Sequence, residues 1–471
     1  MNKGRKIRRI TAVFIMLSSF TAFLPSQVAL YSYDDFLRLM EDNNAEVQKA
    51  KQDFTQSVLD IKDAKAGFFP QAVLTASGTY MFNPMIDDIT INIDDLLSGI
   101  DFPAGMKPEP SEQYITLYEG MENTQYSFTL DITQPVFTWG KLTNAVKLYN
   151  EVSDIKKLQL DSKRKQLSAE LKTRLASAYY IDSILTLLEE QKSKTHRLLQ
   201  ISEEAWGQGA LLYQDLLDAR IQSKEIDIAS VEINEQFSSL LLGIEKITGL
   251  KNLTREQIVF TPDAEQYKRK ALEDRSELME KALSDKQESI TILAKLEQVS
   301  MYSNKIAKAS VYWKPDLALN LSLGYSGPRF PLVETDWYRK NDYSANATIA
   351  IRTTVFDGGK KLNDIQRTQS EAESAVIDAG QAKTVLRQTL IQQFNTMDLS
   401  IAKIEYETLK IENYDSKIAQ QKQLFDSGYG SETTLIQAEI EKISAEIKRI
   451  QHYISLANAY YTVEYICTLP Y

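Results

Sequence analysis

The sequence predicts a mixed α and β membrane protein, in which a duplicated unit supplies four transmembrane β-strands and several very long helices. Three observations lead to this fold class. The 471 residues include only 12 Pro and 18 Gly, which are bunched and leave long stretches without a helix breaker. Two distant parts of the chain share one residue pattern in a constant register. Each half also contains segments that alternate apolar and polar residues over roughly 9 to 11 residues, the length of a tilted transmembrane strand.

The duplication is clearest where a strand is expected to lead into a helix. The segment DITQPVFTWGKLTNAV (131–146) matches AIRTTVFDGGKKLNDI (350–365), with an offset of 219 residues between Gly140 and Gly359 (359 − 140). The same offset recurs further along the chain, where WGQG aligns with FDSG. Chance matches would not keep one register over this distance.

A second match lies upstream in each half and has a longer offset. GFFPQAVLTASGTY matches VYWKPDLALNLSLGY with 245 residues between Pro70 and Pro315 (315 − 70). The first half must therefore carry 26 extra residues (245 − 219) between its two strands, within 81–124. We divide the chain into an N-terminal segment, a first repeat and a second repeat, over 1–26, 27–262 and 263–471.

Residues 1–26 are expected to be an export signal. Five Lys and Arg residues precede an apolar run over 10–24, and Pro25 and Ser26 follow the run. A permanent anchor is the weaker interpretation, because the run is shorter than the roughly 20 residues that a spanning helix needs. No later segment is apolar for long enough to cross a bilayer as a helix, so membrane insertion would have to use strands.

Four strands are predicted, at about 71–81, 125–137, 316–325 and 344–356. The third strand alternates strictly, with apolar residues from Leu317 to Tyr325 on one face and small or polar residues on the other. One face therefore suits lipid and the other suits water. A soluble sheet on a core would explain any single strand equally well, but the repetition in both halves favours membrane strands. Asp131 and Arg352 fall on the polar faces and would point into a barrel lumen.

Four strands cannot close a barrel by themselves. An open strand edge in lipid leaves backbone groups unpaired, at a cost of several kcal/mol each. Several copies of the chain must therefore share one barrel. Two or more copies satisfy this requirement, because about eight strands make the smallest usual closed barrel.

The insertion within 81–124 is strongly acidic. It holds nine Asp and Glu residues against Lys107 alone. We expect a flexible acidic loop outside the membrane. The spacing of the acids matches no calcium-loop motif, so surface charge is the favoured interpretation over a calcium site.

The longest helices are predicted over 141–205, 211–248, 360–426 and 431–467. The first stretch lacks Gly and Pro over 65 residues (205 − 141 + 1), which as one helix spans roughly 98 Å. Its narrow apolar stripe through Leu167, Leu171 and Leu175 is typical of helix-on-helix packing with two wet faces. A tube around a water-filled bore has this pattern, and so does an ordinary bundle or coiled coil. The helices are joined in pairs by turns in which four glycines are expected to supply left-handed conformations, Gly207, Gly209, Gly428 and Gly430.

These residues carry a resemblance to a known family, the TolC-like outer-membrane efflux proteins. The matching motifs are PVFTWGK and TVFDGGK at the strand-to-helix junctions, the two prolines named above, and the tips WGQGALLYQDLLDAR and FDSGYGSETTLIQAE. The likeness covers about Tyr33 to Leu469. It implies a homotrimer with a shared 12-stranded β-barrel in the outer membrane, continued by an α-barrel in the periplasm. It further implies a passive exit channel for small molecules or exported proteins, which works with a periplasmic adaptor protein and an inner-membrane pump and needs no cofactor.

The same resemblance assigns roles to the helical tips. The positions that match adaptor-docking tips are Gly209, Ala210, Leu211, Gly428 and Tyr429. The periplasmic entrance or gate is expected to involve Trp206, Phe425, Asp215 and Asp218. The chain departs from the family pattern on the second tip, where Thr434 and Gln437 stand in place of acids.

The two aspartates of the first tip allow two interpretations. Asp215 and Asp218 lie one helical turn apart and, repeated around a ring, could repel anions or bind cations. They could equally be solvated acids near a helix start, a position that the helix dipole favours.

Other classes of function are disfavoured. His196 and His452 are the only histidines, and no Ser, Cys or carboxylate constellation accompanies them, so the sequence predicts no enzyme. The net charge of −10 and the lack of a basic stripe disfavour nucleic-acid binding. The remaining competitor is a periplasmic coiled-coil structural or adaptor protein, which would share the export signal and the helices but not paired strands in both halves.

Overall fold

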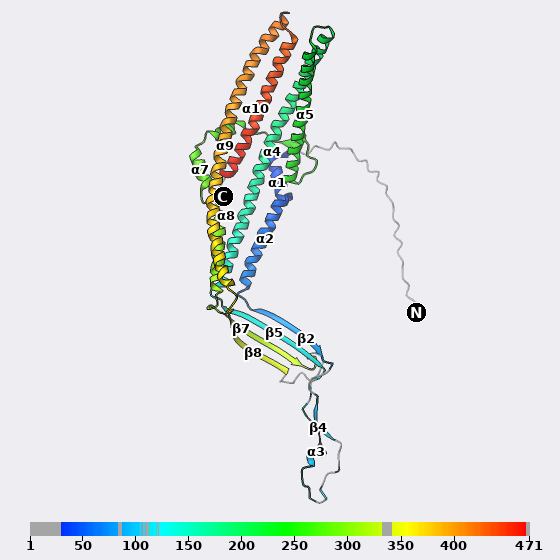
Figure 1. The fold of residues 1–471 in the computed structure, drawn as a ribbon, viewed down its shortest axis with the longest axis vertical. Coiled ribbons are helices and arrows are strands. Elements are labelled where there is room, and N and C mark those ends of the chain that lie inside the picture. The colour runs from blue at the N-terminus through cyan, green and yellow to red at the C-terminus, as the bar shows by residue number, and fades with distance from the viewer. Residues whose placement is uncertain are drawn as a thin grey trace, which may run out of the picture.

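The computed structural model describes residues 30–82, 87–103, 105–106, 109, 113–118, 120, 122–331 and 342–467. The predicted export signal lies outside these residues. The chain is long and narrow: long helices fill one part, a four-stranded sheet follows, and a small hairpin extends beyond the sheet (Figure 1). Among the described residues, no helix combines the length and the hydrophobicity that a membrane-spanning helix requires.

The two halves run through similar elements. The first half contains β1 (Tyr31–Ser32), α1 (Tyr33–Asn43), α2 (Ala45–Ala66), β2 (Gln71–Tyr80), β3 (Ile89–Asn92), α3 (Ile93–Leu97), β4 (Tyr114–Tyr118), β5 (Thr124–Phe137), α4 (Lys141–Gly207) and α5 (Tyr213–Thr248). The second half contains a 3-10 turn (Arg255–Gln257), β6 (Ile258–Val259), α6 (Ala264–Ala271), α7 (Arg275–Leu283), α8 (Glu288–Ala309), β7 (Asp316–Gly327), β8 (Tyr343–Arg352), α9 (Lys360–Asp426) and α10 (Glu432–Cys467). The predicted combination of four strands with very long helices is confirmed.

Four strands form one antiparallel sheet in the order β2-β5-β7-β8. One row across the sheet joins Leu74, Leu130, Leu323 and Ala345. The next row joins Val73, Asp131, Ser322 and Asn346. Because neighbouring residues of a strand point to opposite faces, the register collects aliphatic side chains on one face and mostly polar ones on the other.

The last strand is shorter than predicted. β8 ends at Arg352, opposite Asp316, the first residue of β7. Beyond that point β7 offers no further partner, and the Thr353 hydroxyl instead donates to the carbonyl oxygen of Tyr312 at 2.7 Å. The chain then turns through Gly358 and Gly359, whose φ angles are +67° and +87°, into α9. A match in sequence between the two junctions thus did not give strands of equal length.

Part of the acidic insertion is ordered into secondary structure. β3 and β4 pair as an antiparallel hairpin, and α3 follows β3 directly. The Asn92 side chain accepts the Asp94 backbone N–H at 2.9 Å, which caps this short helix. The backbone N–H of Gly120 donates to Asp88 at 2.7 Å. The insertion therefore differs from the flexible loop expected from composition.

The long helices pack side by side in the order α5, α4, α10, α9, with α2 and α8 against the half nearer the sheet (Figure 1). One core cluster joins α9 to α10 and to the short helices α6 and α7 through Leu390, Met397, Leu456, Tyr267 and Leu278. A second cluster joins α1 to α4 and α5 through Phe36, Met40, Leu171, Leu175 and Ile244. The helical part therefore has its core midway along the hairpins, and the tips lie far from it.

Candidate functional site

The first helical hairpin ends in a tip with a defined backbone motif. The Gly209 N–H bonds to the carbonyl oxygen of Trp206 at 2.9 Å, and the Ala210 N–H bonds to that of Ala205 at 2.8 Å. This pair of bonds is a Schellman motif, which needs a left-handed residue after the helix. Gly209 supplies it with a φ of +73°.

The second tip repeats the motif at the duplicated positions. The Gly428 N–H bonds to the carbonyl oxygen of Phe425 at 2.9 Å, the Tyr429 N–H bonds to that of Leu424 at 3.0 Å, and Gly428 has a φ of +80°. The expectation of four left-handed glycines was therefore half wrong. Gly207 is the last residue of α4. Gly430 is required by space instead, because an added Cβ would lie 2.7 Å from the Phe425 nitrogen.

The predicted docking residues lie together on these exposed ends. Gly209, Ala210 and Gly428 are exposed, and the Tyr429 side chain is 89% exposed. Leu211 is half-buried. Of these five residues, only Tyr429 is a large and strongly exposed side chain.

The entrance residues occupy both tips but differ in their surroundings. Trp206 and Phe425 hold equivalent places in the two Schellman motifs, and Trp206 packs near the Tyr213 ring at 6.0 Å between centroids. Asp215 lies in the first turn of α5, where the helix dipole favours a negative charge. Asp218 is exposed and receives a long 3.5 Å hydrogen bond from the Gln214 amide.

Sequence reasoning missed a forked ion pair between the two hairpins. Arg197 of α4 donates to Glu432 of α10 through Nε at 2.9 Å and through Nη2 at 3.1 Å. Glu432, the first residue of α10, therefore places an acid beside the second tip, where Thr434 and Gln437 are uncharged. No local pattern could reveal this pair, because 235 residues separate its members.

Further polar links continue this contact between α4 and α10. Lys194 Nζ donates to Glu439 at 2.7 Å, and the Gln191 amide donates to the Ser444 hydroxyl at 2.9 Å. Together with the fork they occupy about two turns of α4. The hairpins are therefore joined near their tips by polar contacts, whereas the first core cluster, which joins α4 to α10 nearer the sheet, is apolar.

The polar face of the sheet carries the two charges predicted for the lumen. Asp131 lies in the middle of β5 and Arg352 at the end of β8, and the register places both on the same face. Arg352 lies opposite Asp316, which itself pairs with Lys141 at 2.7 Å. The charges at the helical end of the sheet are therefore mixed in sign.

Among the described residues, no group of three or more His, Cys, Asp or Glu side chains is arranged to hold a metal ion. The chain combines an open four-stranded sheet, apolar on one face, with long paired helices that end in exposed tips. The sequence profile of the outer membrane efflux protein family matches residues 37–250 and 286–464. The chain belongs to this family, and it is an efflux channel of the outer membrane and not an enzyme. This membership favours the channel over the periplasmic coiled-coil alternative.

Solved structures share the fold at low sequence identity. The Campylobacter jejuni CmeC outer membrane channel superposes with a TM-score of 0.69 at 12% identity, covering 98% of this chain and 94% of that one. The outer membrane protein VceC of Vibrio cholerae gives 0.67 at 12% identity, covering 92% and 94%. The open state of the Neisseria gonorrhoeae MtrE outer membrane channel gives 0.64 at 11% identity, covering 92% and 88%. No curated protein sequence matches the chain significantly.

Proposed function

We propose that this efflux channel is the passive outer-membrane exit duct of a tripartite efflux or type I secretion system, and that it works as a homotrimer. In this proposal three chains share one 12-stranded barrel in the outer membrane and one helical tube in the periplasm. A periplasmic adaptor protein docks on the helical tips, and an inner-membrane pump supplies the energy. The channel itself conducts small molecules or exported proteins without performing chemistry.

The open edges of the sheet support a shared barrel. β2 and β8 are the edge strands, and no described strand pairs with their outer edges. Unpaired backbone groups cost several kcal/mol each in lipid, so both edges need partners. If β2 of one chain pairs with β8 of the next, the barrel closes by cyclic contacts, and three chains give about twelve strands.

The apolar face of the sheet supports insertion into lipid. Leu323, Ile349 and Ile351 lie on this face and are largely exposed. Exposed aromatic side chains gather where the sheet meets the helices, at Phe69, Trp139, Trp313 and Phe356. Tyr80 and Phe82 are exposed at the other end of β2. An apolar band between two aromatic zones is the pattern of a transmembrane barrel at the two lipid–water interfaces.

The tips support a docking role and an acidic entrance. Exposed apolar residues on both tips offer a surface to an adaptor, and Asp215 and Asp218 lie on the first turns of α5 beside it. In a trimer these acids would form a ring that favours cations. Trp206 and Phe425 would flank the ring from the two kinds of tip.

Two measurements test the proposal. Purified protein in detergent should have the mass of three chains by light scattering, and it should form cation-preferring pores in planar bilayers. The double variant Asp215→Asn, Asp218→Asn should lower the cation preference, measured as the reversal potential. The control Asp378→Asn changes an exposed acid of α9 far from the tips and should leave the preference unchanged. A monomer recovered from the soluble periplasm without detergent would refute the duct, and an anion-preferring pore would refute the acidic entrance.

A further inference from the structure

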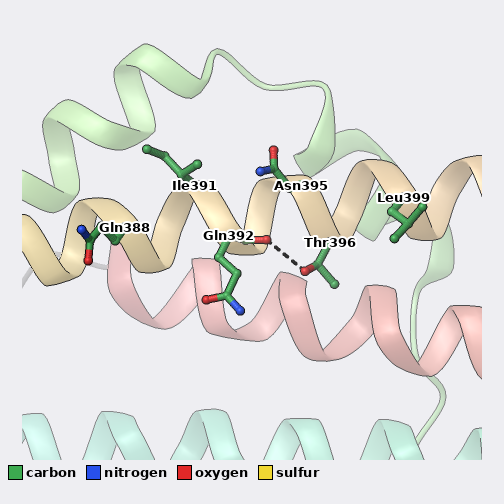
Figure 2. A pocket seen from close by; sticks show the side chains of 6 residues that line it. All are labelled: Gln388, Ile391, Gln392, Asn395, Thr396 and Leu399. Carbon is green, nitrogen blue, oxygen red and sulfur yellow. Dashed lines mark hydrogen bonds between the residues drawn. The ribbon is translucent and has the colours of Figure 1, made fainter.

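The outer side of α9 carries an uncovered heptad stripe. Its residues recur every three and four positions and include Val385, Gln392, Asn395, Leu399, Tyr406 and Leu409, all exposed. Figure 2 shows the part of this stripe nearer the sheet, where Gln388, Gln392, Asn395 and Leu399 bound a shallow groove. This spacing is the seam of a coiled coil, and α10 already packs on a different side of α9.

The helix at the opposite end of the row carries a matching stripe. On α5 the exposed residues Ile221, Lys224, Ile228, Val231, Glu235 and Leu242 also recur every three and four positions. This stripe lies on a different side of α5 from Ile244 and Ile247, which are buried in the core cluster shared with α4. Both ends of the row of four helices are therefore open seams.

The duplication supplies a template for closing these seams. Adding 219 to the residue numbers of α4 gives those of α9, and subtracting 219 from those of α10 gives those of α5. The contact of α4 with α10 therefore has its duplicated counterpart in a contact of α9 with α5. The α10 residues that correspond to the α5 stripe are buried or half-buried, and Ile440 (for Ile221) and Tyr461 (for Leu242) are among the buried ones. On α4, Tyr180 is buried and corresponds to Leu399. The exposed stripes of α5 and α9 are thus the duplicated counterparts of the α10 and α4 surfaces that pack against each other inside one chain.

Charges beside the two stripes are complementary. Lys403, Lys410 and Lys417 recur every seven residues along one flank of the α9 stripe. Asp218, Glu225 and Glu232 recur every seven residues along the α5 stripe. Within the part of the chain that the structure describes, Glu225 and Glu232 form no ion pair, while Lys410 and Lys417 each pair with one acid of their own chain at 3.3 Å, Glu407 and Glu441.

One hydrogen bond inside the chain indicates how the row of lysines on α9 aligns with the row of acids on α5. Gln191 of α4 bonds to Ser444 of α10 at 2.9 Å. Their duplicated counterparts are Lys410 (191 + 219) and Glu225 (444 − 219). Because α5 and α9 run in opposite directions, moving seven residues back along α9 means moving seven residues forward along α5. Lys403 then lies opposite Glu232, and Lys417 lies opposite Asp218. In this register each of the three lysines lies opposite an acid. A shift by one heptad would leave one lysine and one acid without an oppositely charged residue facing them.

We propose that a second copy of this chain seats its α5 on the α9 stripe in antiparallel register, held by the pairs Lys403–Glu232, Lys410–Glu225 and Lys417–Asp218 between copies. The proposal rests on the oligomeric channel proposed above and adds its subunit register. The pair nearest the tips uses Asp218, so in this register most of the charge of the acidic ring proposed above comes from Asp215.

Zero-length cross-linking of the purified oligomer tests the register. A water-soluble carbodiimide joins a lysine amine to a carboxylate in direct contact. We expect covalent dimers and trimers on denaturing gels, with Lys410–Glu225 among the linked peptides found by mass spectrometry. Lys410→Arg keeps the cation but cannot couple, so this link should vanish while Lys403–Glu232 and Lys417–Asp218 remain. Links displaced by one heptad, such as Lys410 to Glu232, or links only to in-chain Glu407, would overturn the register.

Charge exchange gives an independent readout. Lys410→Glu and Glu225→Lys should each lower the temperature at which the oligomer dissociates, and the double variant should recover most of that loss. Additive losses would count against contact between the two residues. If the unmodified protein is a conducting trimer but lacks these links, only the register fails. If it is a monomer, the proposed channel assembly fails as well.

Discussion

The contact between α4 and α10 near the tips provides a direct test of what holds the two hairpins together. Lys194 and Glu439 meet at 2.7 Å, and their side chains are 27% and 29% exposed. Glu439→Gln removes the charge and keeps the size of the side chain. The ion pair is therefore lost with little change in packing, and the hairpins should separate more readily.

The size of the effect follows from the exposure of the pair. A partly exposed ion pair contributes roughly 0.2–1 kcal/mol. Losing it favours separated hairpins by a factor of about 1.4 to 5 in each chain, since about 1.4 kcal/mol corresponds to a tenfold change. In the proposed trimer, three chains that open together would multiply these factors to about 3-fold to 150-fold.

Single-channel recording in planar bilayers measures this change as the fraction of time spent in the larger-conductance state. The matched control is Glu203→Gln, which makes the same charge change near the tips but breaks the 3.0 Å pair with Arg220 inside the α4–α5 hairpin. The exchange of charges in Lys194→Glu, Glu439→Lys should restore the original behaviour. Equal effects of Glu439→Gln and Glu203→Gln would refute the reasoning, because they would point to entrance charge and not to hairpin separation.

Three further predictions concern stability and are read from thermal unfolding followed by circular dichroism. Gly428→Ala should cost about 1–2 kcal/mol because of its left-handed backbone, whereas the helical Gly207→Ala should not destabilise; equal effects would contradict the tip geometry. Tyr267→Phe removes a hydroxyl that bonds to the buried Tyr461 hydroxyl at 3.0 Å and should cost about 1–3 kcal/mol, with the exposed Tyr114→Phe as an unaffected control. Burial raises the pKa of the Cys467 thiol to about 11 from 9.0. The unfolded thiol therefore ionises first, so the stability that the folded thiol contributes is complete below about pH 9 and is lost as the pH rises to about 11. Cys467→Ala should flatten this part of the pH profile, and an unchanged slope would contradict the assignment.

Local sequence patterns were sufficient to predict much of the fold. The helix predicted over 360–426 matches α9, and the alternation from Leu317 to Tyr325 lies within β7. These elements depend on periodicity and on helix breakers, which are visible in a short window of sequence. The tips were visible for the same reason, since the Schellman motif needs a glycine at a fixed place.

Contacts between distant residues could not be predicted in this way. Nothing near Arg197 indicates Glu432, because their contact depends on how two hairpins pack. The pairing of β3 with β4 was also missed, because acidic composition outweighed two short apolar runs at Ile89 and Tyr114. The end of β8 was misplaced for a third reason: a strand stops where its partner stops, and the partner β7 begins at Asp316.

The duplication makes the same helix contact twice, once inside the chain and once, in the proposed register, between copies. The internal contact is always within reach, so the neutral Gln191–Ser444 bond is sufficient there. Separate copies must find their register by encounter, and complementary charges speed and direct such encounters more than they strengthen the final contact. Replacing Lys410 with Gln and Glu225 with Ser copies the internal pair into the proposed subunit contact. We expect this variant to assemble more slowly at low salt and to lose part of the salt dependence of its assembly rate, with a nearly unchanged dissociation temperature. Stopped-flow light scattering after dilution from denaturant at several ionic strengths measures the rate, and an unaltered salt dependence would show that the lysine and acid ladders do not guide assembly.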